Sequence, residues 1–459
     1  MSKFSISDLP AGSTVHMIGI GGISMSALAE ILINFGYKVT GSDVRDSNLI
    51  ERLRKNGAQI YIGQSADNID SPDLVCYTAA ISETNPELVK ARTLGVPVIE
   101  RAELLGAVMK KYKYPIAVAG THGKTTTTSM MALVLLAAQK NPTILVGGEL
   151  NQINGNYYIG GGEYLPFEAC EYVESFLHFE PFVSIITNVE EDHMDFFKDL
   201  NHIISSFGKF ARLTDKNGCI IVCFDEENAM KVVQNVDRKI IGYAINNKNA
   251  DYIAENIEID AYDRPAFDVY HNGEFLVSIK LSVGGEHNIL NALAVAAAAD
   301  FFGIDPAAIK EGLEEFVGAK RRFEKLGSFN GVDVVDDYAH HPTEIKKTIE
   351  TAKKMPYKNV WVAFQPHTYS RTEAFLENFA EALKLADKVM ITDVYAAREK
   401  YNGRVHACDL AALIPGSVYM NDMKAMERYI RQNAQPGDLV ISMGAGSITE
   451  LGHALVDDE

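Results

Sequence analysis

Apolar, β-branched runs followed by a glycine-rich turn and a helical period recur along this chain of 459 residues. The pattern first predicts a strand at residues 14–20 and a helix from about residue 24 to 35, and it begins again at residues 115–119 and 332–335. Strands that alternate with helices in this way are typical of parallel α/β proteins, in which helices connect strands of one sheet. We therefore expect an α/β fold.

At about 150 residues per domain, the length predicts roughly three domains. We place them at residues 1–108, 109–319 and 320–459. The first and third are expected to be Rossmann-like. The second is expected to be a P-loop ATPase-like sheet with added antiparallel strands, because residues 251–283 alternate apolar and polar side chains and contain the hairpin signal Asn272-Gly273.

Charge and composition exclude several classes of function. The formal net charge of −18 disfavours a nucleic-acid binder or a protein of anionic membranes, because phosphate groups would be repelled. The apolar runs are too short to span a bilayer, and residues 1–10 lack the apolar core of a secretory signal. The 5 cysteines are scattered, as expected of free thiols in a reducing compartment. We expect a cytoplasmic enzyme without membrane insertion or a nucleic-acid partner.

The segment at residues 117–126 predicts a phosphate-binding loop. An apolar strand is followed by glycines and then by a helix that begins near Lys124. Backbone N–H groups at such a helix N-terminus suit phosphate oxygens, Lys124 would meet the β- and γ-phosphates, and the Thr125 hydroxyl would bind Mg²⁺. A plain glycine turn is disfavoured by the strand and helix around it. The candidate ATP-binding residues of the loop are Gly120, Thr121, His122, Gly123, Lys124, Thr125 and Thr126.

Another glycine-rich turn follows the first predicted strand; because it precedes the phosphate loop in the chain, we call it the first glycine-rich turn. It resembles a dinucleotide fingerprint in which Ser24 replaces the third glycine, and Asp43 after the next strand is placed to meet a ribose. NAD, another diphosphate such as that of a UDP-sugar, and a tight turn without ligand all fit this local pattern. The candidate residues are Gly19, Gly21, Gly22, Ile23, Ser24, Ser42 and Asp43.

Polar side chains also gather after other predicted strands, where open α/β sheets place their ligands. Glu168 and His193 supply an oxygen and an imidazole that suit Mg²⁺ near a triphosphate, although carboxylates at such positions are also common helix caps. Asn288 and Asn291 lie on one face of a helix, either to contact a base edge or to cap. Acids, a phenol and imidazoles at residues 336–342 and 365–371 indicate a site rather than a core.

Taken together and in this order, these stretches resemble the Mur ligase family over nearly the whole chain. The stretches are 19–26 (GIGGISMS), 120–128 (GTHGKTTTT), 175–178 (SFLH), 187–194 (TNVEEDHM), 287–291 (HNILN), 321–323 (RRF), 336–344 (DDYAHHPTE) and 364–371 (FQPHTYSR). The resemblance implies three α/β domains, with ATP and Mg²⁺ as cofactors.

The resemblance also implies a role for each candidate residue. The first glycine-rich turn would hold a UDP-sugar diphosphate and the second would bind ATP, with Thr125, Glu168 and His193 as metal ligands. Asn288 and Asn291 would lie at the adenine, and Arg322 and Asp336 would approach the nucleotide from the third domain. Tyr338, His340 and Arg371 would contact the incoming amino acid. The implied catalytic residues are Lys124, Glu168, His193 and His340.

The implied reaction joins L-alanine to the carboxylate of UDP-N-acetylmuramate through an acyl phosphate, with His340 as the first candidate to take the proton of the amine. A ligase that adds a recycled tripeptide to the same sugar nucleotide is the first alternative, and an NAD-dependent oxidoreductase the second. A monomer or weak homodimer is expected. Three positions depart from the family pattern: Ser24 and Ala339 stand in place of glycines, and Cys170 in place of an aspartate.

Overall fold

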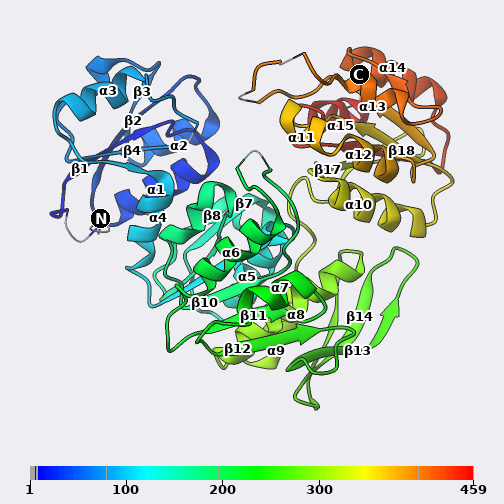
Figure 1. Ribbon diagram of the computed structural model, residues 1–459, viewed down its shortest axis with the longest axis horizontal. Coiled ribbons are helices and arrows are strands. Elements are labelled where there is room, and N and C mark those ends of the chain that lie inside the picture. The colour runs from blue at the N-terminus through cyan, green and yellow to red at the C-terminus, as the bar shows by residue number, and fades with distance from the viewer. Residues whose placement is uncertain are drawn as a thin grey trace.

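The computed structural model describes residue 6 and residues 9–78, 80–194, 196–397, 399–401 and 403–457. Within these residues the strands form three separate sheets, each covered by helices. In Figure 1 the N-terminal sheet (blue) lies at the upper left and the C-terminal sheet (yellow to red) at the upper right, both above the larger central sheet. The predicted class, three α/β units, is confirmed.

The N-terminal sheet has the strand order β3-β2-β1-β4-β5, and all its neighbouring strands are parallel. This order is that of one doubly wound half, and its direction reverses between β1 and β4, where ligands of such sheets bind. The strands are β1 (Thr14–Ile18), β2 (Lys38–Asp43), β3 (Gln59–Ile62), β4 (Leu74–Tyr77) and β5 (Val98–Glu100). The helices are α1 (Ile23–Asn34), α2 (Asn48–Lys55), α3 (Pro86–Thr93) and α4 (Arg101–Met109).

The central sheet has ten strands in the order β15-β14-β13-β12-β11-β10-β6-β9-β7-β8. Its middle is parallel, with β6 between β9 and β10, so that the segments after these three strands meet at one edge. The strands are β6 (Tyr114–Ala119), β7 (Ile144–Leu150), β8 (Gly155–Tyr158), β9 (Tyr164–Glu168), β10 (Val183–Ile186), β11 (Cys219–Cys223), β12 (Ile240–Ala244), β13 (Tyr252–Ile259), β14 (Pro265–His271) and β15 (Glu274–Lys280). The helices are α5 (Lys124–Ala137), α6 (Leu200–Ala211), α7 (Glu227–Val233), α8 (Glu286–Phe301) and α9 (Pro306–Glu314), with the 3₁₀ segments η3 (Asn151–Ile153) and η4 (Tyr172–His178).

Antiparallel hairpins extend both edges of the central sheet. The expected one at residues 251–283 is confirmed: β13, β14 and β15 pair antiparallel, and Asn272 and Gly273 both have positive φ, as a tight hairpin turn requires. The hairpin of β7 and β8 at the other edge was not predicted, because the glycine-rich sequence around it gives no clear alternation.

The C-terminal sheet has the order β16-β17-β21-β18-β19-β20, with β16 as an antiparallel edge strand. The strands are β16 (Glu324–Phe329), β17 (Val332–Asp337), β18 (Val360–Phe364), β19 (Lys388–Ile391), β20 (Val418–Tyr419) and β21 (Leu439–Met443). The helices are α10 (Pro342–Lys354), α11 (Tyr369–Ala374), α12 (Leu376–Leu383), α13 (Ala407–Ala412), α14 (Met423–Asn433) and α15 (Thr449–Val456). A capping box formed by His341 and Glu344, with Pro342 in the first turn, starts α10 directly after β17.

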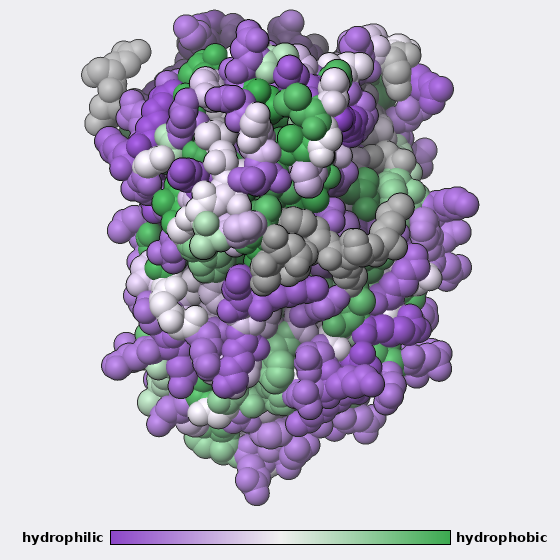
Figure 2. All heavy atoms as spheres, turned by 90° about the vertical axis from the view of Figure 1, so that its left-hand side faces the viewer, coloured by the Kyte–Doolittle hydropathy of each residue, from purple (hydrophilic) through white to green (hydrophobic). Residues whose placement is uncertain are grey.

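Apolar side chains are concentrated where the sheets pack against their helices, and one cluster continues from the N-terminal unit into the central unit. Hydrophilic residues cover most of the face shown in Figure 2, with smaller hydrophobic groups between them. Among the described helices, none combines the length and the apolar character that a bilayer span needs.

Candidate active site

The predicted phosphate loop connects β6 to α5, with Gly120 and Gly123 at positive φ. Two side chains that follow β10 hold its backbone. The Asn188 side chain accepts a hydrogen bond from the His122 amide at 2.8 Å and donates one to the His122 carbonyl at 3.1 Å, and the Thr187 hydroxyl donates to that carbonyl at 2.7 Å. The loop is therefore fixed in shape by its neighbours in the sheet, which suits a phosphate cradle.

Lys124, the first residue of α5, is held by an acidic partner. Its ammonium group donates to both carboxylate oxygens of Glu171 at 3.1 Å and to the Gly120 carbonyl at 2.5 Å. Burial lowers the pKa of an ammonium group, but the charge of Glu171 outweighs burial and raises the pKa of Lys124 to about 12. Lys124 is thus a cation at the phosphate loop, and the Glu171 contact neutralises it.

The predicted metal ligands lie around the same loop. Glu168 ends β9 and accepts a hydrogen bond from the Gly147 amide at 2.6 Å, while Thr125 lies against Gly148 on the same strand, β7. The His193 Nε2 atom is 3.9 Å from a Glu171 oxygen, and burial lowers the pKa of His193, so its imidazole is neutral. The fold therefore brings a hydroxyl, a carboxylate and a neutral imidazole to one end of the loop.

A cavity of about 480 Å³ lies between the central and C-terminal units. Of the predicted residues, its lining includes His122, Gly123, Thr125, Thr126, Asn288, Asn291 and Arg322. The two asparagines join the helices beneath it, because Asn291 accepts a hydrogen bond from Thr127 of α5 at 3.2 Å and donates to Asn288 at 3.1 Å. This cavity reaches from the phosphate loop to α8, as a nucleotide site must.

The neighbouring acids of β17 face different surroundings. Asp336 is fully buried away from the cavity and accepts hydrogen bonds from Arg321, Ser442 and Thr449 at 2.7–3.0 Å. Asp337 lines the cavity, and burial raises its pKa to about 6. Asp336 was expected at the nucleotide, whereas the acid of β17 that lines the cavity is Asp337.

The three candidate amino-acid contacts gather on the C-terminal unit. His340 Nδ1 donates to the Tyr338 carbonyl at 3.0 Å, its ring lies 5.2 Å from that of Tyr338, and burial lowers the pKa of His340 to about 4. Arg371 of α11 donates to Asp192 of the central unit at 2.9 Å. Burial opposes the charge of Asp192, but Arg371 outweighs burial and holds the pKa of Asp192 well below its usual range. This ion pair closes one side of the contact between the units.

The first glycine-rich turn joins β1 to α1, at the point where the strand order reverses. Asp43 accepts a hydrogen bond from the Gly21 amide at 2.9 Å and so fixes the turn. Ser42 is buried and donates to Glu87 at 2.6 Å, which turns its hydroxyl into the sheet. A cavity of about 130 Å³ is lined by Ser24, Arg101 and Glu168 among others, so it connects this turn with the region of the metal ligands.

Comparisons with known proteins agree with these features. Three family models match consecutive parts of the chain: "Mur ligase family, catalytic domain" at residues 14–113, "Mur ligase middle domain" at 118–299 and "Mur ligase, glutamate ligase domain" at 321–446. The chain belongs to the Mur ligase family.

Individual Mur ligases resemble it from end to end. A UDP-N-acetylmuramate–L-alanine ligase of Acetivibrio thermocellus is 48% identical, covering 100% of this chain and 99% of the relative. A UDP-N-acetylmuramate–L-alanine ligase of Alkaliphilus metalliredigens is also 48% identical, covering 97% of this chain and 97% of the relative. Among solved structures, the UDP-N-acetylmuramate–alanine ligase of Thermotoga maritima has a TM-score of 0.81 with 34% identity, covering 97% of this chain and 98% of that one. A murein peptide ligase of Psychrobacter arcticus has a TM-score of 0.74 with 26% identity, covering 97% of this chain and 98% of that one.

Some residues at this site were not singled out by the sequence. Tyr243, His287 and Lys347 line the large cavity, and Arg101 lines the small one. They come from separate elements, and of these four residues only His287 lies in a motif stretch, 287–291, where the two asparagines were the residues proposed for the site. Glu171 stood in the sequence three residues after Glu168, but nothing in that spacing showed that it pairs with Lys124.

Proposed function

We propose that this Mur ligase joins L-alanine to the carboxylate of UDP-N-acetylmuramate at the expense of ATP, a step in the synthesis of peptidoglycan precursors. The observation that carries the proposal is the 48% identity over complete chains with relatives named for that reaction. The murein peptide ligase structure is also similar over nearly its whole length, but only 26% identical. A tripeptide as the amine substrate is therefore the second candidate.

The geometry supports a nucleotide at the central unit. A Cβ atom on Gly123 would lie 2.8 Å from the Asn291 side chain, and one on Gly120 would lie 1.9 Å from the Thr187 hydroxyl, so the loop needs glycine for its tight approach to its neighbours. In our proposal, residues 120–126 bind the phosphates, Asn288 and Asn291 meet the adenine, and Arg322 approaches from the C-terminal unit. Asp337, rather than Asp336, is then the acid nearest the nucleotide.

The donor atoms fit a magnesium ion. Thr125 and Glu168 both lie against β7 and supply a hydroxyl and a carboxylate, which are hard oxygen ligands, and the neutral His193 adds an imidazole. We propose these three residues as metal ligands. Bound Mg²⁺ would neutralise charge on the transferred phosphoryl group.

The proposed chemistry assigns one task to each cluster. A carboxylate is a poor acylating agent, so it first accepts the γ-phosphoryl group and becomes an acyl phosphate, which the amine of L-alanine then attacks with release of phosphate. Lys124 leaves Glu171 to meet the phosphates. Burial keeps His340 unprotonated at neutral pH, so its imidazole is free to take the amine proton. Tyr338 and Arg371 position the amino acid.

The first glycine-rich turn is proposed to bind the UDP-sugar diphosphate through Gly19, Gly21, Gly22, Ile23 and Ser24, with Asp43 holding the turn. The small cavity from Ser24 to Glu168 supports this assignment, because it gives the sugar carboxylate a route to the phosphate loop. We further propose domain boundaries near residues 108 and 319, a cytoplasmic location, and a monomer or weak homodimer.

A phosphate-release assay tests the proposal. Release from ATP is expected to require both UDP-N-acetylmuramate and L-alanine, with glycine, L-serine and the tripeptide as competing amines. Faster turnover with the tripeptide would favour the second candidate. Equal release without either substrate would refute the ligase assignment.

A further inference from the structure

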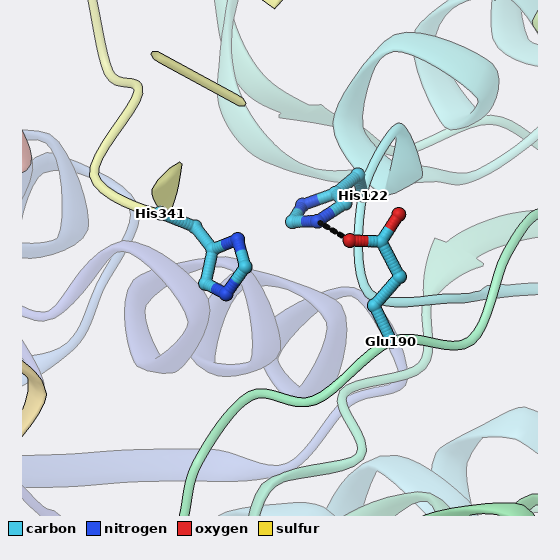
Figure 3. Close-up of side chains that lie close together, drawn as sticks. All are labelled: His122, Glu190 and His341. Carbon is cyan, nitrogen blue, oxygen red and sulfur yellow. Dashed lines mark ion pairs between the residues drawn. The ribbon is translucent and has the colours of Figure 1, made fainter. Parts of the chain in front are cut away.

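Two imidazoles and a carboxylate from distant segments meet beside the phosphate loop, outside the magnesium ligand set. His122 lies in the loop, Glu190 follows β10, and His341 precedes α10 of the C-terminal unit. Figure 3 shows the rings of His122 and His341 close together, with the Glu190 carboxylate beside His122, and the two ring planes are tilted by 43°. Each residue offers one ligand atom, and these atoms lie within 4.8 Å of one another.

The spacing is close to that of ligands on one ion. The His122 Nε2 and Glu190 Oε2 atoms are 3.4 Å apart. Bonds of about 2.0–2.1 Å in tetrahedral geometry place two ligand atoms roughly 3.3–3.4 Å apart. The three ligand atoms lie within 4.8 Å of one another, so His341 reaches the same ion after a movement of no more than about 1.5 Å. The pair of His122 and Glu190 therefore already has the separation that a bound zinc ion requires.

The hydrogen bonds of both rings leave the correct nitrogen for a metal. His122 Nδ1 faces Glu344 Oε1 at 3.1 Å, and His341 Nε2 faces the Glu191 carbonyl at 3.1 Å. Histidines that bind a metal commonly donate their second ring N–H to a carboxylate or a carbonyl, which fixes the ring and its tautomer. His122 Nε2 and His341 Nδ1 then remain as ligand atoms.

These remaining nitrogens are weakly engaged within the protein. His122 is 8% exposed, and its Nε2 atom is buried without a hydrogen bond of good geometry in the part of the chain that the structure describes. His341 Nδ1 accepts a long bond from the Thr343 amide at 3.3 Å. The contact of His122 Nε2 with Glu190 at 3.4 Å and the bond of His341 Nδ1 with Thr343 are both long, so a metal ion at this position would replace two long contacts with short ligand bonds.

We propose that His122, Glu190 and His341 form a zinc site that joins the central and C-terminal units. Two imidazoles and one carboxylate suit Zn²⁺, with a water molecule as the fourth ligand, whereas Mg²⁺ prefers a set of oxygens. Because His341 belongs to the C-terminal unit and the other two ligands to the central unit, zinc binds only when the two units are in contact, and it holds the phosphate loop against α10. Glu344 orients His122 without touching the ion.

Zinc titration of the full-length protein tests the site. The chelator-treated protein is titrated with Zn²⁺ in excess Mg²⁺, so that oxygen-rich sites are filled. The titration is done at pH 9, because Glu190 and Glu344 outweigh burial and raise the pKa of His122 to about 9, so that at lower pH a proton competes with the metal. We expect one zinc per chain, nitrogen and oxygen neighbours in its X-ray absorption spectrum, and a visible ligand-field spectrum with Co²⁺.

Matched variants locate the ion. His341→Gln and Glu190→Gln are each expected to weaken zinc binding at least tenfold, and Glu344→Gln, which keeps the capping box, about tenfold. His453→Gln on α15 and His193→Gln are the controls and should bind zinc as the wild type does. Circular dichroism confirms that each variant is folded.

Three results would overturn the proposal. One is the absence of zinc binding above Mg²⁺, which is expected if His122 is only the imidazolium partner of two carboxylates. Another is unchanged binding in both His341→Gln and Glu190→Gln. The third is loss of zinc in His193→Gln, which would place the ion at the proposed magnesium ligands.

Discussion

Replacement of Asn188 by alanine tests how much one side chain contributes to the conformation of the phosphate loop. The Asn188 side chain makes two hydrogen bonds with the His122 backbone, at 2.8 and 3.1 Å, and touches the loop from the end of a neighbouring strand. At about 1 kcal/mol for each bond, the variant loses about 2 kcal/mol of the free energy that holds the loop in its ordered conformation. If ATP binding must restore that order, its affinity falls about 30-fold, since every 1.4 kcal/mol is roughly a factor of ten.

The measurement is the KM for ATP in the phosphate-release assay, together with calorimetric binding of the nucleotide. Asn228→Ala is the matched control, because Asn228 makes a hydrogen bond of 3.0 Å to the Val189 carbonyl next to Asn188 and none to the loop. We expect the control to keep its KM within about twofold. A folded Asn188→Ala variant with the wild-type KM would refute the argument that this side chain preorganises the loop.

Three further predictions follow from the same geometry. Lys124→Ala should abolish phosphate release but leave UDP-sugar binding unchanged, because the first glycine-rich turn belongs to another sheet; a calorimetric loss of both would contradict the division into units. Gly120→Ala should raise the KM for ATP at least tenfold, since its Cβ would lie 1.9 Å from the Thr187 hydroxyl, whereas Gly416→Ala, also at positive φ but in open space, should keep the wild-type KM. Burial raises the pKa of Asp337 to about 6 from 3.8, so the folded protein retains this proton to higher pH and the stabilisation present below pH 4 is lost as pH rises through 6. Wild type should therefore lose on the order of 3 kcal/mol relative to Asp337→Asn between pH 4 and 7 in denaturant unfolding, and a constant difference would show that the carboxyl titrates normally.

The sequence alone predicted the structure where residues close together in the chain determine the conformation. The loop between β6 and α5 is set by glycines beside an apolar strand, and the β13–β15 meander by alternation and an Asn-Gly turn. The hairpin of β7 and β8 lacks such alternation, so only its pairing in the sheet reveals it.

Adjacent residues of a strand face opposite sides, which is why the sequence did not distinguish Asp336 from Asp337. Their roles depend on which side of β17 carries the cavity, and that is settled when the C-terminal unit docks on the central one. Asp336 accepts its hydrogen bonds from two other parts of the chain, through Arg321, Ser442 and Thr449.

The sequence by itself determined the α/β class, the phosphate loop and the family, because these rest on local spacing and on motifs in a fixed order. The tertiary structure alone decided that Glu171 neutralises Lys124, that Arg371 reaches Asp192, and that His122, Glu190 and His341 share one site. Each of these contacts joins segments that are distant in the chain and carry no common pattern. Their distances are fixed by how sheets and units pack, and no local preference encodes that packing.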